Sequence, residues 1–175
     1  PSMDSDFVDE ADAMEKLLAV VNGSDGHPEA YRRCASVLIR LIKLTCAKNL
    51  FWDILYDELP EYFEVIQRPV CLANVAMHLL DRSYDDALDL EADGSSSDVI
   101  YSMFYLETNA VFNNCYTFNT EVQAIVAQAQ KTQLAFFRHM QLWILQEKRP
   151  ALNQCTDGYC LLSGREVGGL TIMRC

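Results

Sequence analysis

Basic residues are scarce in this 175-residue sequence. Lys and Arg total 14 against 25 Asp and Glu, so the formal net charge is −11. Proteins that grip the phosphate backbone of nucleic acid rely on clustered Lys and Arg, whereas an excess of carboxylates attracts basic partners. The composition therefore predicts no direct binding of nucleic acid and favours a partner rich in Lys and Arg.

Long apolar runs are missing too. No segment approaches the roughly 18 apolar residues that a membrane-spanning helix needs, and residues 1–10 lack the basic stretch of a signal peptide. The seven Cys are an odd number, and five of them (34, 46, 71, 115 and 160) lie among apolar or aromatic neighbours, which favours free thiols over disulfides. We therefore expect a soluble, intracellular protein without membrane contact, whose 50% hydrophobic content suffices for one sizeable core.

The signatures of common enzymes do not occur. There is no P-loop, no Gly-rich dinucleotide loop and no His-Glu-x-x-His motif. A thiol nucleophile with an imidazole base is limited to Cys115 or Cys71 with His78, and no recognisable spacing joins these residues. Reactive thiols also need an electropositive setting that an acidic chain does not offer. The sequence therefore predicts a protein that is not an enzyme.

What the sequence does contain is helical periodicity, with apolar residues spaced by three and four. These spacings predict helices over residues 7–21, 28–47, 70–80, 100–118 and 122–144. Residues 49–68 show no sustained period and predict a long ordered loop with a short helical piece near residues 62–66. Seven Asp or Glu at residues 81–98 predict an exposed linker, and Thr120 with Gln123 has the spacing of a capping box.

This pattern predicts an all-α protein in three parts. Residues 1–27 form an N-terminal helical extension, and residues 28–149 form a four-helix bundle with one long loop after its first helix. After Pro150 the composition changes, because four of the seven Gly and three of the seven Cys fall in the last 25 residues. Residues 150–175 are therefore a small Cys/Gly-rich tail or the start of another module.

The tail leaves one metal hypothesis open. Cys155, Cys160 and Cys175 have the spacing C-x4-C-x14-C, which is compatible with three of the four ligands of a zinc ion. No fourth ligand is evident, and the three His of the chain are scattered. We therefore expect no cofactor, and zinc in the tail is the less favoured alternative to unliganded thiols.

Two segments are far more specific than the helical pattern. They are Leu59-Pro-Glu-Tyr-Phe-Glu-Val-Ile-Gln-Arg-Pro-Val-Cys-Leu72 and Val111-Phe-Asn-Asn-Cys-Tyr-Thr-Phe-Asn119. Together they closely resemble the bromodomain family, which pairs a hydrophobic-Pro-acidic-Tyr-aromatic…Ile-x-x-Pro-Met-Asp-Leu segment with a later Phe-x-Asn-Cys-x-x-aromatic-Asn segment. The resemblance covers roughly residues 28–147. It implies a left-handed four-helix bundle whose ZA and BC loops frame a pocket for acetyl-lysine.

The resemblance assigns the polar part of such a pocket to two residues. Asn119 matches the family Asn that bonds the acetyl carbonyl, and its side-chain NH2 is a suitable donor. Tyr62 matches the Tyr whose hydroxyl holds a water that bridges to the acetyl oxygen. Ile125 takes the place of the family's gatekeeper on the last helix. The alternatives are a helix cap for Asn119, a half-buried loop Tyr and plain core packing for Ile125.

The apolar part of the pocket is assigned in the same way. The family's aromatic shelf corresponds best to Phe51, with Trp52 beside it, and the sequence leaves open which of the two faces the ligand. The other expected lining residues are Leu55 and Leu59 from the loop, and Cys115 and Phe118 from the third bundle helix. Cys71 departs from the family, which usually has Asp there to brace the start of the next helix, and so predicts altered loop geometry more than an altered pocket.

The resemblance implies a nuclear chromatin reader that binds acetylated histone tails, H3 or H4, and works with other chromatin-complex proteins. Histone tails are rich in Lys and Arg, so acidic residues near the pocket would attract them. The candidates for this rim are Asp53, Asp57, Glu58, Glu61 and Glu121. The alternative is a bromodomain-like scaffold for protein–protein interaction whose pocket is filled by Phe51, by Trp52 or by a shortened loop.

Overall fold

The computed structural model describes residues 9–44, 50–54, 60–90 and 96–144, with residues 87–90 described by their backbone alone. It also gives the backbone of a short antiparallel pair, β1 (Tyr159–Cys160) and β2 (Arg165–Glu166). The helices, in chain order, are α1 (Glu10–Asn22), α2 (Glu29–Ile42), α4 (Pro60–Val65), α5 (Leu72–Leu80), the 3-10 helix η1 (Ser83–Leu90), α6 (Ser96–Phe118) and α7 (Gln123–Trp143). None of the described helices has the length and apolar character needed to cross a membrane.

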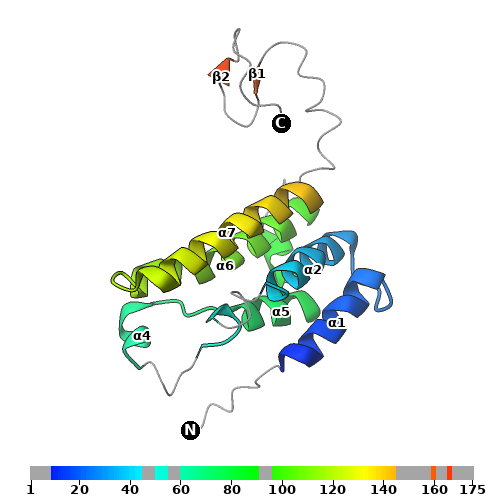
Figure 1. Ribbon diagram of the computed structural model, residues 1–175. Helices are drawn as coiled ribbons and strands as arrows, with labels where there is room; N and C mark the ends of the chain where they lie inside the picture. The colour runs from blue at the N-terminus through cyan, green and yellow to red at the C-terminus, as the bar shows by residue number, and fades with distance from the viewer. Residues whose placement is uncertain are drawn as a thin grey trace.

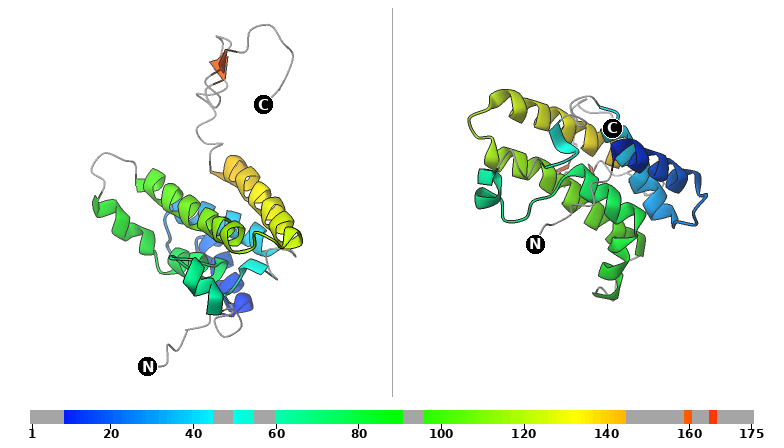
Figure 2. Two further views of the ribbon diagram at one scale, coloured as in Figure 1. Left: turned by 90° about the vertical axis from the view of Figure 1, so that its left-hand side faces the viewer. Right: turned by 90° about the horizontal axis from the view of Figure 1, so that it is seen from below.

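The predicted all-α bundle is confirmed, and it consists of α2, α5, α6 and α7. The two long helices α6 and α7 run side by side, and α2 and α5 complete the bundle (Figures 1 and 2). Aromatic rings fill the centre: Phe104 meets Phe136 edge to face at 5.8 Å, and Phe51 meets Phe112 in the same way at 5.6 Å. Such ring pairs contribute about 0.5–1.5 kcal/mol each beyond simple burial.

The extra N-terminal helix is also present, and it packs on α2 and α5 (Figure 1). The Asp9 carboxylate caps its start by accepting a hydrogen bond from the N–H of Asp12 (3.3 Å). Gly23 ends it with φ = 72°, a left-handed conformation that glycine adopts without steric cost. Ala13, Leu17 and Val20 are fully buried, so α1 shares the core of the bundle.

Because of this shared core, we expect Leu17→Ala to lower the free energy of unfolding by about 2–4 kcal/mol, the usual effect of a large-to-small change at a buried site. Leu18→Ala is the matched control, since Leu18 lies on the exposed side of the same helix, and it should cost less than about 1 kcal/mol. Urea denaturation followed by circular dichroism measures both. If Leu17→Ala lowered the free energy of unfolding no more than Leu18→Ala does, α1 would not share the core of the bundle.

The predicted exposed linker at residues 81–98 is wrong for its first part. Residues 83–90 form η1, and the Tyr84 side chain is only 3% exposed. Its ring stacks on Tyr31 at 6.1 Å, and its hydroxyl donates a hydrogen bond to Oε2 of Glu107 on α6. The other carboxylate oxygen of Glu107 lies 2.7 Å from Nδ1 of His78 on α5. One buried aromatic therefore holds an otherwise acidic segment against three helices.

Two helix ends also differ from the sequence predictions. The helix predicted over 28–47 ends at Ile42, and residues 45–49 lie outside the described chain. The predicted capping box at Thr120 is not formed, because α7 begins at Gln123 and Val122 is its N-cap residue. The N–H of Val122 donates to the carbonyl of Asn119 (3.3 Å). This turn uses residues 119–122 as the link between α6 and α7, so Thr120 lies outside the helix it was expected to cap.

The zinc hypothesis falls mostly outside the described residues. Cys155 and Cys175 are not described, and Cys160 is described only as backbone in β1. Within the part of the chain that the structure describes, no group of three His, Cys, Asp or Glu is placed to hold a metal ion.

Candidate functional site

A cavity of about 390 Å³ lies at the end of the bundle where α6 turns into α7. Its walls come from the segment 50–54, from α4, from the start of α5 and from the facing ends of α6 and α7. The lining residues are Leu50, Phe51, Trp52, Asp53, Ile54, Tyr62, Val70, Cys71, Val111, Cys115, Phe118, Asn119 and Ile125. In Figures 1 and 2, α4 lies beside the α6–α7 turn.

The cavity gathers six of the eight residues that the sequence nominated for a site. They are Phe51, Tyr62, Cys115, Phe118, Asn119 and Ile125. The other two, Leu55 and Leu59, lie outside the described residues. The structure therefore brings together residues from positions 51 to 125 of the chain, and their roles in binding a ligand stay predictions.

Asn119 is the principal hydrogen-bonding side chain of the cavity, and it follows the last residue of α6. Its backbone N–H donates to the carbonyl of Cys115 (2.9 Å), and its side-chain Nδ2 donates to the same oxygen (3.1 Å). Nδ2 also makes a long hydrogen bond to Sγ of Cys115 (3.7 Å). An amide nitrogen carries two hydrogens, so a ligand carbonyl would replace the weakly accepting thiol as the partner of the second hydrogen. This geometry orients the amide before any ligand arrives.

Tyr62 faces the same end of α6 from the loop. Its ring meets Phe118 edge to face, with 5.1 Å between the ring centroids and an angle of 72°. A second tie between the loop and α6 comes from Asn114, whose Nδ2 donates to the carbonyl of Arg68 (2.9 Å). The aromatic contact and the hydrogen bond fix the position of α4 and thus of the Tyr62 side chain.

Phe51 and Trp52 both line the cavity, so each is placed where it could face a ligand. Both are buried. Phe51 packs against Phe112 in the core, and the carbonyl of Trp52 accepts a hydrogen bond from the N–H of Ala73 on α5 (2.9 Å). Among the described residues the indole N–H of Trp52 is buried without a hydrogen-bond partner.

Comparison with protein families gives a match to the bromodomain model over residues 34–131, which is more than half of the chain. The chain belongs to the bromodomain family. Bromodomains are, in general, acetyl-lysine reader modules without enzymatic activity, and they are typically associated with chromatin in the nucleus. Searches of curated proteins and of solved structures gave no match. The matched region begins inside α2 and ends inside α7, so it contains the whole lining of the cavity described above.

Sequence reasoning missed several lining residues of this bromodomain, and Cys71 is the most informative of them. It is the N-cap residue of α5, and both its backbone N–H (3.0 Å) and its thiol (3.1 Å) donate to Oδ1 of Asn74. Where the family usually has a carboxylate, this chain thus braces the helix through an amide three residues later. The signal was available, because Val70 and Cys71 occupy the two positions after the motif's Pro.

The two thiols of the cavity are poor nucleophiles. Burial raises the pKa of the Cys71 thiol above its usual value, and burial likewise raises the pKa of Cys115, with a smaller opposing effect from the Asn119 hydrogen bond. The thiolate is the reactive form of cysteine. At neutral pH both side chains are therefore neutral, weakly polar wall groups, which suits a binding cavity and not a catalytic one.

Of the five acidic residues predicted for the rim, one lines the cavity and two more are described nearby in the chain. Asp53 lines it, with Oδ1 accepting a hydrogen bond from the N–H of Ile54 (2.7 Å). Glu61 on α4 and Glu121 in the α6–α7 turn are exposed. The other two residues predicted for the rim, Asp57 and Glu58, lie outside the described chain.

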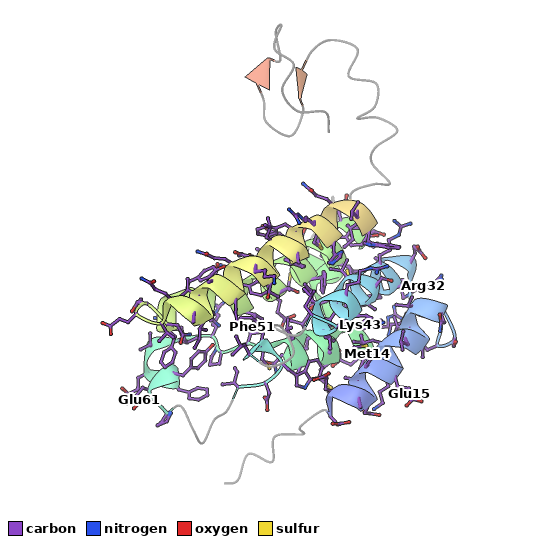
Figure 3. All side chains as sticks on the ribbon, in the orientation of Figure 1. Met14, Glu15, Arg32, Lys43, Phe51 and Glu61 are labelled. Carbon is purple, nitrogen blue, oxygen red and sulfur yellow. The ribbon has the colours of Figure 1, made fainter. Side chains whose placement is uncertain are left out.

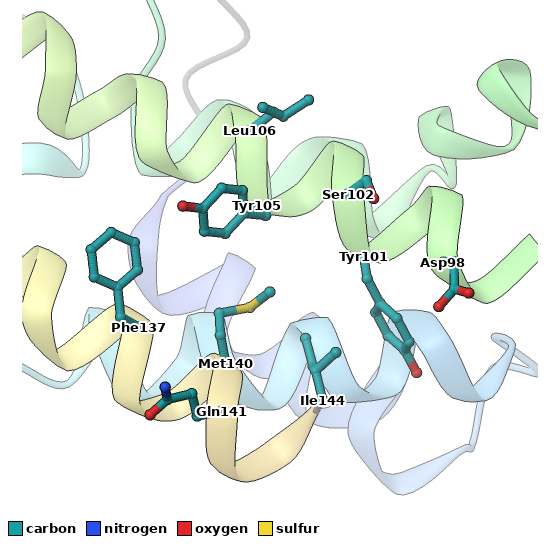
Figure 4. Close-up of a pocket in the computed structure, with 9 residues that line it drawn as sticks. All are labelled: Asp98, Tyr101, Ser102, Tyr105, Leu106, Phe137, Met140, Gln141 and Ile144. Atoms are coloured by element: carbon teal, nitrogen blue, oxygen red, sulfur yellow. The ribbon is translucent and has the colours of Figure 1, made fainter. Parts of the chain in front are cut away.

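A larger groove, of about 730 Å³, lies between the first half of α6 and the second half of α7 (Figure 4). Its walls are the side chains of Asp98, Tyr101, Ser102, Tyr105, Leu106, Phe137, Met140, Gln141 and Ile144. None of the residues that carry the family resemblance lies in it. It is therefore a separate feature of the bundle and not the site that the motifs mark.

Proposed function

We propose that this bromodomain binds acetylated lysine in histone tails, H3 or H4, through the cavity beside the α6–α7 turn. The observation that carries the proposal is the orientation of Asn119, whose side-chain amide is held by Cys115 at the edge of a cavity walled by aromatic and aliphatic groups. The proposal includes a nuclear location and work alongside other chromatin-complex proteins, as is typical of the family.

The chemistry of the cavity suits an acetylated side chain. Acetylation removes the charge of lysine and leaves a neutral amide on an apolar stem. Burying such an amide requires one good hydrogen bond and apolar walls, whereas burying an unpaired ammonium costs far more. Asn119 supplies the donor for the acetyl carbonyl, and Phe51, Phe118 and Ile125 supply apolar walls.

Tyr62 adds a second polar group. A water held by the Tyr62 hydroxyl would bridge to the acetyl oxygen, and bridging waters are enthalpically close to direct hydrogen bonds. An ammonium has no acceptor atom, so an unmodified lysine could not accept the N–H of Asn119.

Carboxylates around the cavity support a basic peptide as the ligand. Asp53, Glu61 and Glu121 would attract the Lys and Arg residues that flank an acetyl-lysine in a histone tail. At physiological salt such rim charges act within about 8 Å. They therefore raise the association rate more than the affinity.

The scaffold alternative requires that Phe51, Trp52 or a shortened loop fill the cavity, and residues 55–59 of that loop lie outside the described chain. Phe51 and Trp52 are packed into its walls, and a volume of about 390 Å³ lies between them and the facing helix ends. An open cavity with an oriented donor favours a reader over a scaffold.

Titration with acetylated and unmodified H3 and H4 tail peptides, followed by calorimetry, tests the proposal. We expect dissociation constants of roughly 10 to several hundred micromolar for an acetylated peptide, as is usual for small sites with limited burial. The unmodified peptides should bind at least about tenfold more weakly, since they lack the carbonyl that Asn119 needs. Equal affinities for both forms would favour the scaffold.

A further inference from the structure

Charge is distributed very unevenly in this acidic protein. Residues 29–43 and 123–143, which comprise α2 with its C-cap Lys43 and α7, contain six of the 14 Lys and Arg but only one of the 25 Asp and Glu. The basic residues are Arg32, Arg33, Arg40, Lys43, Lys131 and Arg138. The two helices thus carry a formal charge of +5, and the rest of the chain carries −16. Because α2 and α7 pack against each other, this positive charge is concentrated on one part of the bundle.

A groove of about 560 Å³ lies in this basic region, where the start of α2 meets the ends of α1 and α7. Its lining residues are Val21, Glu29, Arg32, Arg33, Ser36, Leu142 and Trp143. Leu142 and Trp143 are 49% and 41% exposed, so two adjacent apolar side chains of the groove are open to solvent. We call this site the basic groove. Arg32 and Glu61 lie at opposite ends of the molecule (Figure 3), so the basic groove is remote from the loop side of the Asn119 cavity.

The basic groove already holds one carboxylate, that of Glu29. Its Oε2 lies 3.1 Å from Nη1 of Arg32, and its Oε1 lies 2.9 Å from Nε of Arg33. Both guanidinium groups are also anchored to backbone: Arg32 donates to the carbonyl of Val21 (3.3 Å) and Arg33 to that of Trp143 (3.1 Å). Glu29 is 56% exposed, so its ion pairs with the two guanidinium groups are open to solvent.

Arg40 extends the positive surface and fixes the aromatic ring. Its guanidinium carbon lies 4.2 Å from the ring centroid of Trp143, a cation–π geometry. Its Nε is buried without a hydrogen-bond partner among the described residues. Burial and then the charge of Arg40 lower the pKa of His139 below its usual value. The Trp143 side chain is therefore held from one side, and its exposed part is available for contact.

We propose that the basic groove binds an acidic peptide segment of a partner protein. One carboxylate of the peptide takes the place of Glu29 between Arg32 and Arg33, and a neighbouring apolar side chain packs on Leu142 and Trp143. The apolar floor suits a peptide better than a nucleic acid. A duplex also needs a longer path of Lys and Arg than these two helices provide, and the −16 on the remainder of the chain repels it. This proposal does not depend on acetyl-lysine binding.

The test uses the whole chain and a fluorescein-labelled 12-residue peptide in which Glu and Asp flank one Leu and one Phe. Fluorescence polarisation at about 50 mM salt should give a dissociation constant of roughly 10–100 µM. A control peptide with the same sequence, but with every Glu and Asp replaced by Lys, should not bind. Arg32→Glu should weaken binding at least about tenfold, whereas Lys131→Glu, the same charge change on α7 outside the groove, should alter it by less than about twofold.

A second pair of variants has the opposite expected sign. Glu29→Gln removes the competing carboxylate and should tighten peptide binding about threefold or more, and Glu15→Gln on the exposed face of α1 is its charge-matched control.

Trp143→Ala should weaken binding, whereas Leu134→Ala, which truncates another exposed apolar residue of α7, should not. Asn119→Ala should leave this affinity unchanged, which separates the basic groove from the acetyl-lysine cavity.

Three results would overturn the proposal. The first is an equal loss in Arg32→Glu and Lys131→Glu, which would mean that only net charge matters. The second is weaker binding in Glu29→Gln with the fold intact by circular dichroism, which would make Glu29 part of the structure and not a stand-in for a ligand. The third is displacement of the peptide by a 15-base-pair DNA duplex at a lower concentration than by unlabelled peptide, which would assign the groove to phosphates.

Discussion

Asn119→Ala is expected to reduce the affinity for an acetylated histone peptide by about 10- to 100-fold, which corresponds to the 1–3 kcal/mol lost when a buried carbonyl is left without its donor. The side chain is the principal amide donor of the cavity, and Cys115 already orients it. Calorimetric titration of the wild type and the variant with one acetylated peptide measures the difference.

Asn113→Ala is the matched control. Asn113 lies six residues earlier in the same motif, and its side chain is exposed on α6. We therefore expect the affinity of Asn113→Ala for the acetylated peptide to match that of the wild type within about twofold. Asn119→Asp is the second comparison, because it keeps the size of the side chain but replaces the donor with a charged acceptor. It should bind no better than Asn119→Ala. Full affinity in either Asn119 variant, with thermal melting unchanged, would remove the proposed role of this amide.

Tyr84→Ala is expected to lower the free energy of unfolding by about 3–5 kcal/mol, the usual range for truncation of a buried aromatic residue. The Tyr84 ring stacks on Tyr31 and meets His78 edge to face at 6.1 Å, so its loss leaves a hole where η1, α2 and α5 join. Tyr84→Phe removes only the hydroxyl that donates to Glu107 and should cost about 1–2 kcal/mol, because a half-buried carboxylate loses one of its two partners. Urea denaturation measures both values.

The control for Tyr84 is Asp86→Ala in the same 3-10 helix. Asp86 is exposed, so its replacement should change stability by less than about 0.5 kcal/mol. If Tyr84→Ala cost no more than this control, residues 83–90 would be a surface segment after all.

Because Tyr84 can ionise, the difference in stability between the wild type and Tyr84→Phe should depend on pH. Burial and then the charge of Glu107 raise the pKa of Tyr84 well above its ordinary value of 10.0. A group whose pKa is higher in the folded state than in the unfolded state stabilises the fold. This contribution is fully present below the unfolded-state pKa, and it is lost as the pH rises from that value toward the folded-state pKa. We therefore expect the wild type to lose stability above about pH 10, and Tyr84→Phe to lose less over the same interval.

Much of the fold could be predicted from the sequence because amphipathic helices carry their own pattern. Apolar residues spaced by three and four predicted α1, α2, α5, α6 and α7, and most of the helix ends lie within a few residues of the predicted ones. The two motif segments predicted that Asn119 and Tyr62 lie together, and both line the same cavity, although their roles in binding stay predictions.

Local pattern failed where a side chain's partner comes from a distant part of the chain. Tyr84 stands in an acidic run that looks solvated, and only its contacts with Tyr31 and Glu107 bury it. The expected capping box at Thr120 failed in a similar way, because the turn after Asn119 delays the start of α7 to Gln123. Cys71 takes the role of a helix cap that its residue type did not suggest.

The sequence by itself determined the helical class, the family motifs and the acidic net charge, since each of these depends on neighbouring residues or on composition alone. Only the tertiary structure decided that Ile54 and Val70 line one cavity with Asn119, and that Arg32, Arg33 and Trp143 meet in the basic groove. The physical reason is that periodicity specifies which face of a helix is buried, whereas the packing of several helices at once selects the residues that it meets.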